Sequence, residues 1–206
     1  MRLYYRSDCP FCWKVRIALH ELSVPYEVVR IHLGETHPDV LRLNPNKTIP
    51  VLVIDDLVLW ESNTILEYLE ERFGPRLLAG EPAARARART LVDYADTIVG
   101  PALRGLVFEK RAKPKAAWDR KVIADSERRW RASLRYLETA LDGRMWFGDA
   151  VGFAECALIP RFGLAEHYGV GVDSAQPNLL RWYTAFKTRP SFRATVPWVQ
   201  ACEDRI

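Results

Sequence analysis

The sequence lacks a long apolar run, although 49% of its 206 residues are hydrophobic and 11% are aromatic. No stretch approaches the roughly 20 apolar residues that cross a bilayer, so no membrane partner is expected. The first residues, Met1–Asp8, carry charges too early for the apolar core of a secretory leader. The composition excludes a disordered chain. We therefore expect a globular, cytoplasmic protein with a substantial core.

Cysteine is scarce, and so is excess charge of either sign. Four cysteines are too few to hold a chain of this length together by disulfides. The net charge of +4 divides into −2 over residues 1–80 and +6 over residues 81–206, and this asymmetry requires no nucleic-acid partner. The placement of the cysteines is more informative than their number. Cys9 and Cys12 form a close pair, whereas Cys156 and Cys202 stand alone.

Residues 1–75 alternate between strand and helix patterns. Short runs rich in β-branched and aromatic residues are typical of strands, and apolar residues at helical spacing separate them. The expected elements are strands at 2–5, 26–31, 51–54 and 57–60, with helices at 10–22, shortly before Asn44, and at 62–73. Asp55 and Asp56 separate the last two strands and predict a hairpin. This order, βαβαββα, predicts a small α+β domain over residues 1–75.

After residues 76–82 the strand patterns end. Apolar side chains recur at helical spacing from Leu91 to Leu106, and again from Trp118 to Leu141 after a helix start expected at Pro114. Further helices are expected at 153–168 and 178–188. The sequence therefore predicts an all-helical domain over residues 83–206.

The motif Cys9-Pro10-Phe11-Cys12 lies between the first expected strand and the helix that follows it. Proline favours the first helical position, which makes Cys9 the expected N-cap. The unpaired N–H groups of the first turn and the positive end of the helix dipole would stabilise a thiolate there. Cys12 would lie one turn further in, less exposed but within reach of Cys9. The pattern predicts thiol–disulfide exchange, in which Cys9 attacks and Cys12 can resolve the mixed disulfide.

Two other interpretations of the cysteine pair remain open. A zinc site needs about four ligands, and the remaining cysteines and histidines show no second paired spacing. We therefore expect no bound metal. Two inert, buried cysteines are the other alternative, which the position at a helix start disfavours.

The chain resembles the glutathione S-transferase superfamily. Three motifs carry the resemblance: Cys9–Cys12, Asn44–Leu52 and Trp60–Ser62. The resemblance extends over nearly the full length and implies a thioredoxin-like N-terminal domain followed by an all-α helical bundle. The dithiol is most similar to the cysteine-type branches, namely the omega-like transferases and the two-domain bacterial glutaredoxin. The resemblance implies glutathione as a cosubstrate, no tightly bound cofactor, and a homodimer.

The resemblance also assigns roles to individual residues. Cys9 and Cys12 would be catalytic. The residues that it implies for glutathione binding are Phe11, Lys47, Ile49, Pro50, Glu61 and Ser62.

Pro50 resembles the family's cis-proline at the start of the third strand, beside the Ile49 backbone that would pair with the cysteinyl part of glutathione. Ser62 would bind the γ-glutamyl carboxylate, Glu61 the ammonium, and Lys47 the glycine carboxylate. Each also has a structural interpretation. Pro50 could be a trans proline at a strand start, Ser62 an N-cap alone, and Glu61 and Lys47 solvated side chains.

In the second domain, Gly148–Glu155 resembles the family's folding signature, in which Ser or Thr caps a helix and an acid follows three residues later. Gly152 takes the capping position, and glycine supplies no side-chain oxygen. Only half of a capping box therefore remains, and Glu155 is expected to be structural rather than catalytic.

Three functions follow as hypotheses. The first is a glutathione-dependent thiol transferase or dehydroascorbate-type reductase that acts through a mixed disulfide at Cys9. The second is conjugation of glutathione to electrophiles, with the hydroxyl of Ser7 or Tyr5 holding the glutathione thiolate. The third is a non-catalytic binding protein on the same scaffold. The reactive thiol that the motif predicts favours the first.

Overall fold

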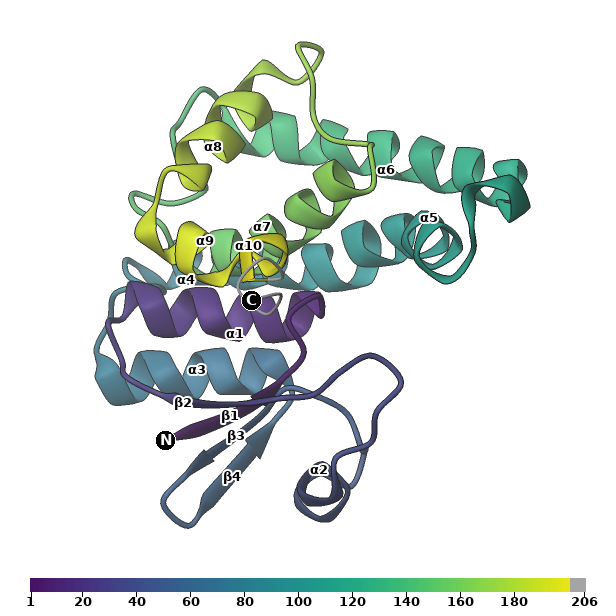
Figure 1. The fold of residues 1–206 in the computed structure, drawn as a ribbon. Coiled ribbons are helices and arrows are strands. Elements are labelled where there is room, and N and C mark those ends of the chain that lie inside the picture. Colours follow the sequence, from purple (N-terminus) through teal and green to yellow (C-terminus); the bar gives the residue numbers. More distant parts are fainter. Residues whose placement is uncertain (201–206) are drawn as a thin grey trace. The chain divides into compact units, whose positions relative to one another are not determined.

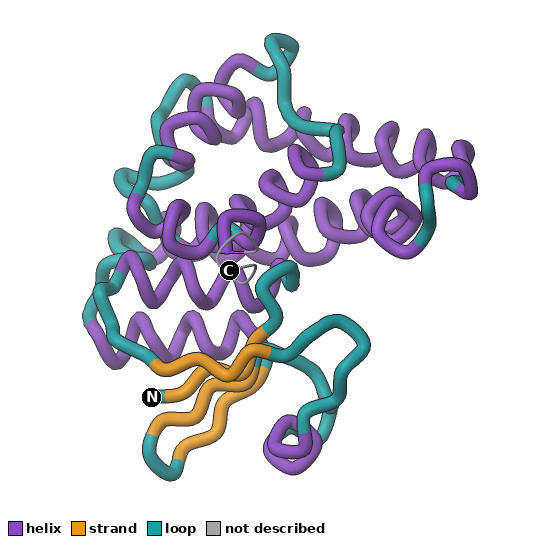
Figure 2. Tube along the Cα trace, viewed as in Figure 1, coloured by secondary structure: helices purple, strands orange, loops and turns teal. Residues whose placement is uncertain are grey.

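The computed structural model describes residues 1–200, the last two by their backbone alone, so Cys202 lies outside the described residues. Contacts divide the chain into two compact units. The first comprises residues 1–79 together with the described residues 188–200, and the second comprises residues 80–187. Figure 2 shows strands in the first unit and helices in both.

The first unit is built on a four-stranded mixed sheet with the strand order β2-β1-β3-β4. β1 pairs in parallel with β2 and antiparallel with β3, and β3 and β4 form the expected hairpin. The strands are β1 (Arg2–Tyr5), β2 (Glu27–Arg30), β3 (Val51–Ile54) and β4 (Leu57–Trp60). The hairpin turns at Asp55, whose φ of 50° lies in the left-handed region that aspartate tolerates. The expected βαβαββα order is confirmed.

Three helices accompany the sheet: α1 (Pro10–Glu21), α2 (Pro38–Leu43) and α3 (Ser62–Phe73). Helices α1 and α3 pack against each other on one face of the sheet (Figure 1). Val40 of α2 instead joins Tyr4 and Val51 in a separate buried cluster. Because side chains alternate along a strand, Leu3 and Tyr4 of β1 point to opposite faces, and both are buried. The sheet is therefore covered on both sides.

The chain ends within this unit. Helices α9 (Pro190–Thr195) and α10 (Pro197–Gln200) follow the second unit in sequence, but α9 packs on α1. Trp13 of α1 donates through Nε1 to Oγ1 of Thr195 at 2.8 Å, and Arg16 donates to the carbonyl of Thr195 at 2.9 Å. Arg189 forms a bidentate ion pair with Glu21. The segment 188–200 therefore contacts α1, although the helical domain was expected to run to residue 206.

The second unit is entirely helical, as expected for this part of the chain. Its helices are α4 (Pro82–Tyr94), α5 (Gly100–Ala112), α6 (Arg120–Leu141), α7 (Phe153–His167) and α8 (Pro177–Lys187). A π-helical turn, η1 (Ala95–Val99), joins α4 to α5, and a 3₁₀ turn, η2 (Lys115–Ala117), precedes α6. The aromatic rings of Trp130, Phe162 and Trp182 bring α6, α7 and α8 together, with centroid distances of 4.9 to 5.0 Å.

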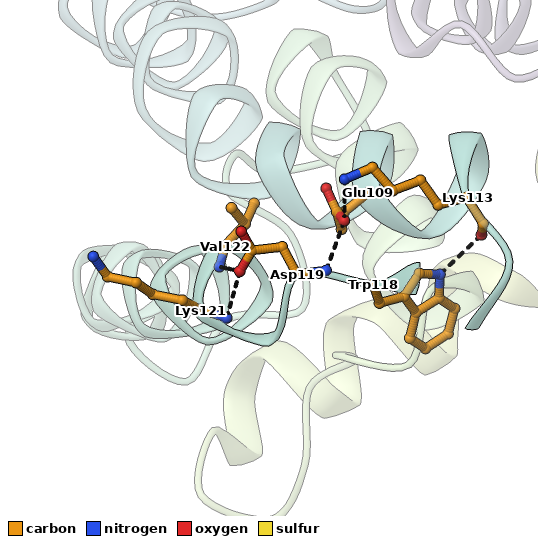
Figure 3. Close-up of polar contacts among 6 residues, drawn as sticks. All are labelled: Glu109, Lys113, Trp118, Asp119, Lys121 and Val122. Atoms are coloured by element: carbon orange, nitrogen blue, oxygen red, sulfur yellow. Dashed lines mark hydrogen bonds and ion pairs between the residues drawn. The ribbon is translucent and has the colours of Figure 1, made fainter. Parts of the chain in front are cut away.

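The start of α6 differs from the expectation at Pro114. The helix begins at Arg120, because the carboxylate of Asp119 accepts hydrogen bonds from the backbone N–H groups of Lys121 and Val122 (Figure 3). A side-chain acceptor at the N-cap satisfies donors that a proline cannot. Pro114 instead precedes the 3₁₀ turn.

Glu155 has the structural role expected of it. Its carboxylate accepts from the backbone N–H groups of Gly152 and Phe147, both at 2.9 Å, and from Nε1 of Trp182 at 3.2 Å. The Gly152 bond is the half capping box predicted from the sequence, and the other two tie α7 to α8 and to the preceding loop.

No helix within residues 1–200 is both long and apolar enough to cross a membrane.

Candidate active site

Cys9 is the N-cap of α1, as predicted. Its backbone is extended, with φ −83° and ψ 117°, and its carbonyl accepts the first helical hydrogen bond from the N–H of Trp13 at 2.9 Å. Pro10 fills the first helical position. Cys9 is 7% exposed and Cys12 is fully buried, and both are free thiols. The sequence therefore places a cysteine where the first turn of the helix presents unpaired donors.

The surroundings of Cys9 lower the pKa of its thiol from about 9.0 to about 6. The largest cause is the hydrogen bond from the thiol of Cys12, followed among the favourable causes by the backbone N–H of Cys12, the charge of Arg6 and the N–H of Phe11; burial opposes them. Burial also raises the pKa of Cys12, and the neighbouring Cys9 raises it further. At neutral pH, Cys9 is a thiolate and Cys12 remains a thiol that donates to it.

This assignment predicts how alkylation of Cys9 depends on pH. We expect the rate of reaction with iodoacetamide to rise with pH and to reach its half-maximum near 6, because only the thiolate reacts. Removing the largest stabilising donor with Cys12→Ala should move the midpoint upward. The rate is followed by peptide mass spectrometry, with Cys9→Ser as the background control. A wild-type midpoint near 9, or a midpoint unchanged in Cys12→Ala, would contradict the assignment.

The loop before β3 is held by the buried side chain of Asn44. Its Nδ2 donates to the carbonyl and the hydroxyl of Thr48, and its Oδ1 accepts from the backbone N–H of Asn46 at 2.9 Å. This network presents Lys47 on the surface with a φ of 56°. The Ile49–Pro50 bond that follows is cis, as predicted.

The helix expected at 62–73 is confirmed, but the structural interpretation of Ser62 as an N-cap is wrong. Glu61 occupies the N-cap position, and Ser62 is the first helical residue, buried at its start. Glu61 has a φ of +68°, which costs a non-glycine residue on the order of 1–3 kcal/mol. Its Oε1 accepts from Nδ2 of Asn46 at 3.3 Å, which connects the loop before β3 to α3. Backbone strain of this kind concentrates at ligand-binding sites, and the residue type gives no sign of it.

The strand register brings these segments to one end of the sheet. Tyr4, near the end of β1, pairs with Val51 at the start of β3. Val51 in turn pairs with Trp60 at the end of β4. The chain leaves β1 toward Cys9, enters β3 from Pro50 and leaves β4 toward Glu61, all at this end. The three motifs, which are separate in the sequence, therefore lie at the same end of the sheet.

Comparisons with known proteins identify this arrangement. Residues 3–77 match the N-terminal domain of glutathione S-transferases, and residues 90–190 match the C-terminal domain. The chain belongs to the glutathione S-transferase family.

The relatives of this transferase have names that describe more than one activity. Glutathione S-transferase GstB of Escherichia coli K12 is 34% identical over 202 residues, which cover 94% of this chain and 96% of GstB. The maleylacetoacetate isomerase of Mus musculus is 35% identical over 178 residues, covering 82% of this chain and 79% of the isomerase. The structure of a glutathione S-transferase from Methylobacillus flagellatus with glutathione bound has a TM-score of 0.80 and 30% identity, covering 95% of this chain and 98% of that one.

Three further residues named from the sequence, Phe11, Tyr5 and Ser7, lie in different surroundings. Phe11 is 37% exposed, and Nζ of Lys14 lies 5.6 Å from the centre of its ring. The ring of Tyr5 is buried, with the guanidinium of Arg16 4.8 Å from its centre. Ser7 is half-buried, in the turn that leads to Cys9. Of the two hydroxyls, that of Ser7 is therefore the better placed beside Cys9, since Tyr5 belongs to β1 and its ring is packed in the core.

Proposed function

We propose that this transferase carries out glutathione-dependent thiol transfer through a mixed disulfide at Cys9, releasing a thiol from a glutathionylated substrate or reducing a dehydroascorbate-type electrophile. The observation that carries the proposal is the cysteine at the N-cap of α1, in surroundings that lower the pKa of its thiol to about 6. A hydroxyl-dependent transferase has no need of a thiolate at this position. Thiol exchange requires one.

Glutathione would bind along the motifs at the end of the sheet. The backbone of Ile49, next to Pro50, would pair with the cysteinyl part. The N-terminal donors of α3 at Ser62 would bind the γ-glutamyl carboxylate, and the carboxylate of Glu61 would accept from the ammonium. Lys47 would meet the glycine carboxylate. The strained backbone of Glu61 and its bond from Asn46 support a role in binding, because strain at one residue persists only where its neighbours hold it.

The reaction proceeds in two exchanges. The Cys9 thiolate attacks the glutathionyl sulfur of a mixed disulfide RS–SG, the S–S bond breaks, and RS⁻ leaves and takes a proton from water. The thiolate of a second glutathione then attacks the glutathionyl sulfur on Cys9, which releases oxidised glutathione and restores the Cys9 thiolate. In the alternative route, Cys12 attacks the sulfur of Cys9 and releases the bound glutathione. The raised pKa of Cys12 favours the first route, because a thiol is a poor nucleophile.

Intact-protein mass spectrometry after incubation with oxidised glutathione tests the proposal. We expect a single glutathione adduct on the wild type and on Cys12→Ser, and no adduct on Cys9→Ser. A Cys9–Cys12 disulfide in the wild type would assign resolution to Cys12. A wild-type protein that remains unmodified, or an adduct that survives Cys9→Ser, would overturn the assignment of Cys9.

A second candidate is glutathione addition in which Cys9 is not modified, as in conjugation or isomerisation. The names of the relatives GstB and maleylacetoacetate isomerase favour it, together with the position of Ser7 beside the start of α1. In this mechanism the hydroxyl of Ser7 would donate to the glutathione thiolate. A rate of conjugation that falls in Ser7→Ala and survives in Cys9→Ser would support this candidate over the first.

A further inference from the structure

Arg6 lies in the turn between β1 and α1, and its guanidinium lies near the two thiols. The backbone N–H of Cys9 donates to the carbonyl of Arg6 at 3.2 Å, which closes the turn. The positive charge of Arg6 lowers the pKa of Cys9, and it opposes the larger effects that raise the pKa of Cys12. A charge has this effect on a neighbouring group only at short range, so the guanidinium is close to both sulfur atoms.

The guanidinium of Arg6 is held by one edge. Its Nε donates to Oδ1 of Asp8, and the two groups form an ion pair whose side chains are each 25% exposed. Within the part of the chain that the structure describes, the Arg6 side chain makes no other hydrogen bond or ion pair. Its two terminal nitrogens therefore keep their donors, in the planar arrangement that binds both oxygens of a carboxylate.

The segment from Arg6 to Arg16 has an excess of positive charge. It contains three cations, Arg6, Lys14 and Arg16, and a single acid, Asp8. The thiolate of Cys9 offsets one of the two excess charges. Lys14 and Arg16 are buried, and each donates hydrogen bonds to groups within the first unit. Since Arg6 is partly exposed, it is the cation of this segment that an anionic substrate can reach.

Arg6 is also separate from the residues proposed to bind glutathione. Ile49 and Pro50 precede β3, and Glu61 and Ser62 begin where β4 ends. In the sheet order β2-β1-β3-β4, both of these strands lie on the same side of β1, whereas Arg6 follows β1 itself. A glutathionyl group bound along β3 and β4 therefore does not require Arg6.

We propose that Arg6 is a specificity-determining residue, which binds a carboxylate of the substrate next to the disulfide that Cys9 attacks. The substrate class is then an acidic glutathionylated thiol, and this inference rests on the proposed thiol transfer. The Cys9 thiolate attacks the glutathionyl sulfur, the S–S bond breaks, and the acidic thiol leaves as a thiolate that takes a proton from water. As the new bond forms, Cys9 loses its negative charge, so Arg6 attracts the substrate carboxylate more strongly than before the reaction.

The carboxylate preference can be tested without thiol transfer by comparing two alkylating reagents. Iodoacetate and iodoacetamide are similar in size, and only the first carries a carboxylate. Both react with the same thiolate, so the ratio of their rates at Cys9 does not depend on how much of the thiol is ionised. The full chain is compared with Arg6→Gln and Arg6→Lys by peptide mass spectrometry. The matched control is Arg2→Gln, which removes an arginine from the opposite end of β1 that pairs with Glu27.

We expect the ratio of the iodoacetate rate to the iodoacetamide rate to fall about tenfold in Arg6→Gln and to stay within about twofold in Arg2→Gln. Arg6→Lys should give an intermediate ratio, because lysine keeps the charge but lacks the planar pair of donors. An unchanged ratio in Arg6→Gln, or an equal fall in Arg2→Gln, would overturn the proposal.

The substrate preference is tested with two mixed disulfides of glutathione, one with 3-mercaptopropionate and one with its uncharged amide. In the wild type, kcat/KM should be about tenfold higher for the carboxylate, and Arg6→Gln should abolish this preference. Equal kcat/KM for the two disulfides in the wild type would overturn the specificity. If the wild type turned over neither disulfide, the proposed thiol transfer would be wrong, and so would the substrate class inferred from it, whereas the ratio of alkylation rates would still decide whether Arg6 binds a carboxylate beside Cys9.

Discussion

Replacing Cys9 by serine is expected to reduce thiol transfer by roughly 10³-fold or more, because the other thiol at the start of α1, that of Cys12, is fully buried and its pKa is raised by burial. The serine hydroxyl has the same place at the N-cap but stays protonated at neutral pH, and its oxygen forms no disulfide. The loss should fall on kcat and on kcat/KM together, since the interaction removed is made in the reacting complex. The measurement is the release of free peptide from a glutathionylated peptide in the presence of glutathione.

Cys12→Ser is the matched control for this result. It removes the thiol that could resolve a disulfide but leaves a hydroxyl that can donate to the Cys9 sulfur in place of the Cys12 thiol. We expect it to retain most of the activity, because a second glutathione completes the reaction. Loss of activity in Cys12→Ser as large as that in Cys9→Ser would show that the two cysteines act as a pair. Activity retained in Cys9→Ser would exclude the mixed disulfide altogether.

The features of this site that the sequence predicts are those set by local chemistry. Proline after Cys9 fixes the helix start, so the N-cap follows from adjacent residues. The hairpin at Asp55 and the alternation of strands and helices follow in the same way. The cis bond at Pro50 was predicted through the surrounding motif, not through proline alone, since most X–Pro bonds in folded proteins are trans.

The features that the sequence did not predict depend on distant contacts. Glu61 adopts a conformation that its residue type disfavours, and its side chain accepts a hydrogen bond from Asn46, 15 residues earlier. The segment after residue 188 packs on α1 through a bond between Trp13 and Thr195, which are 182 residues apart. The spacing of apolar residues shows that a helix has an apolar face, but it does not identify the element that packs against that face. The expected helix start at Pro114 is wrong for a local reason, because the carboxylate of Asp119 supplies the N-cap acceptor and a proline supplies none.

The second large effect is expected on stability. Glu155→Ala leaves three donors inside the second unit without an acceptor: the backbone N–H groups of Phe147 and Gly152, and Nε1 of Trp182. Buried donors left unpaired cost about 1–3 kcal/mol each, and partial access of water to Gly152 reduces the total. We expect the free energy of unfolding in urea to fall by about 3 kcal/mol or more. Asp149→Ala, an exposed acid in the preceding loop, is the control and should change it by less than about 0.5 kcal/mol.

Glu155→Gln separates the hydrogen bonds from the charge. Burial raises the pKa of Glu155 above its ordinary value of 4.5, against the hydrogen bonds that favour the carboxylate. A raised pKa means that the folded protein holds the proton more tightly than the unfolded chain, so ionisation of this group lowers stability. The wild type should therefore lose stability relative to Glu155→Gln as the pH rises from below 4.5 through the raised pKa. A difference between the two proteins that grows in favour of the wild type over that range would show that the hydrogen bonds to the carboxylate, and not its burial, determine its protonation.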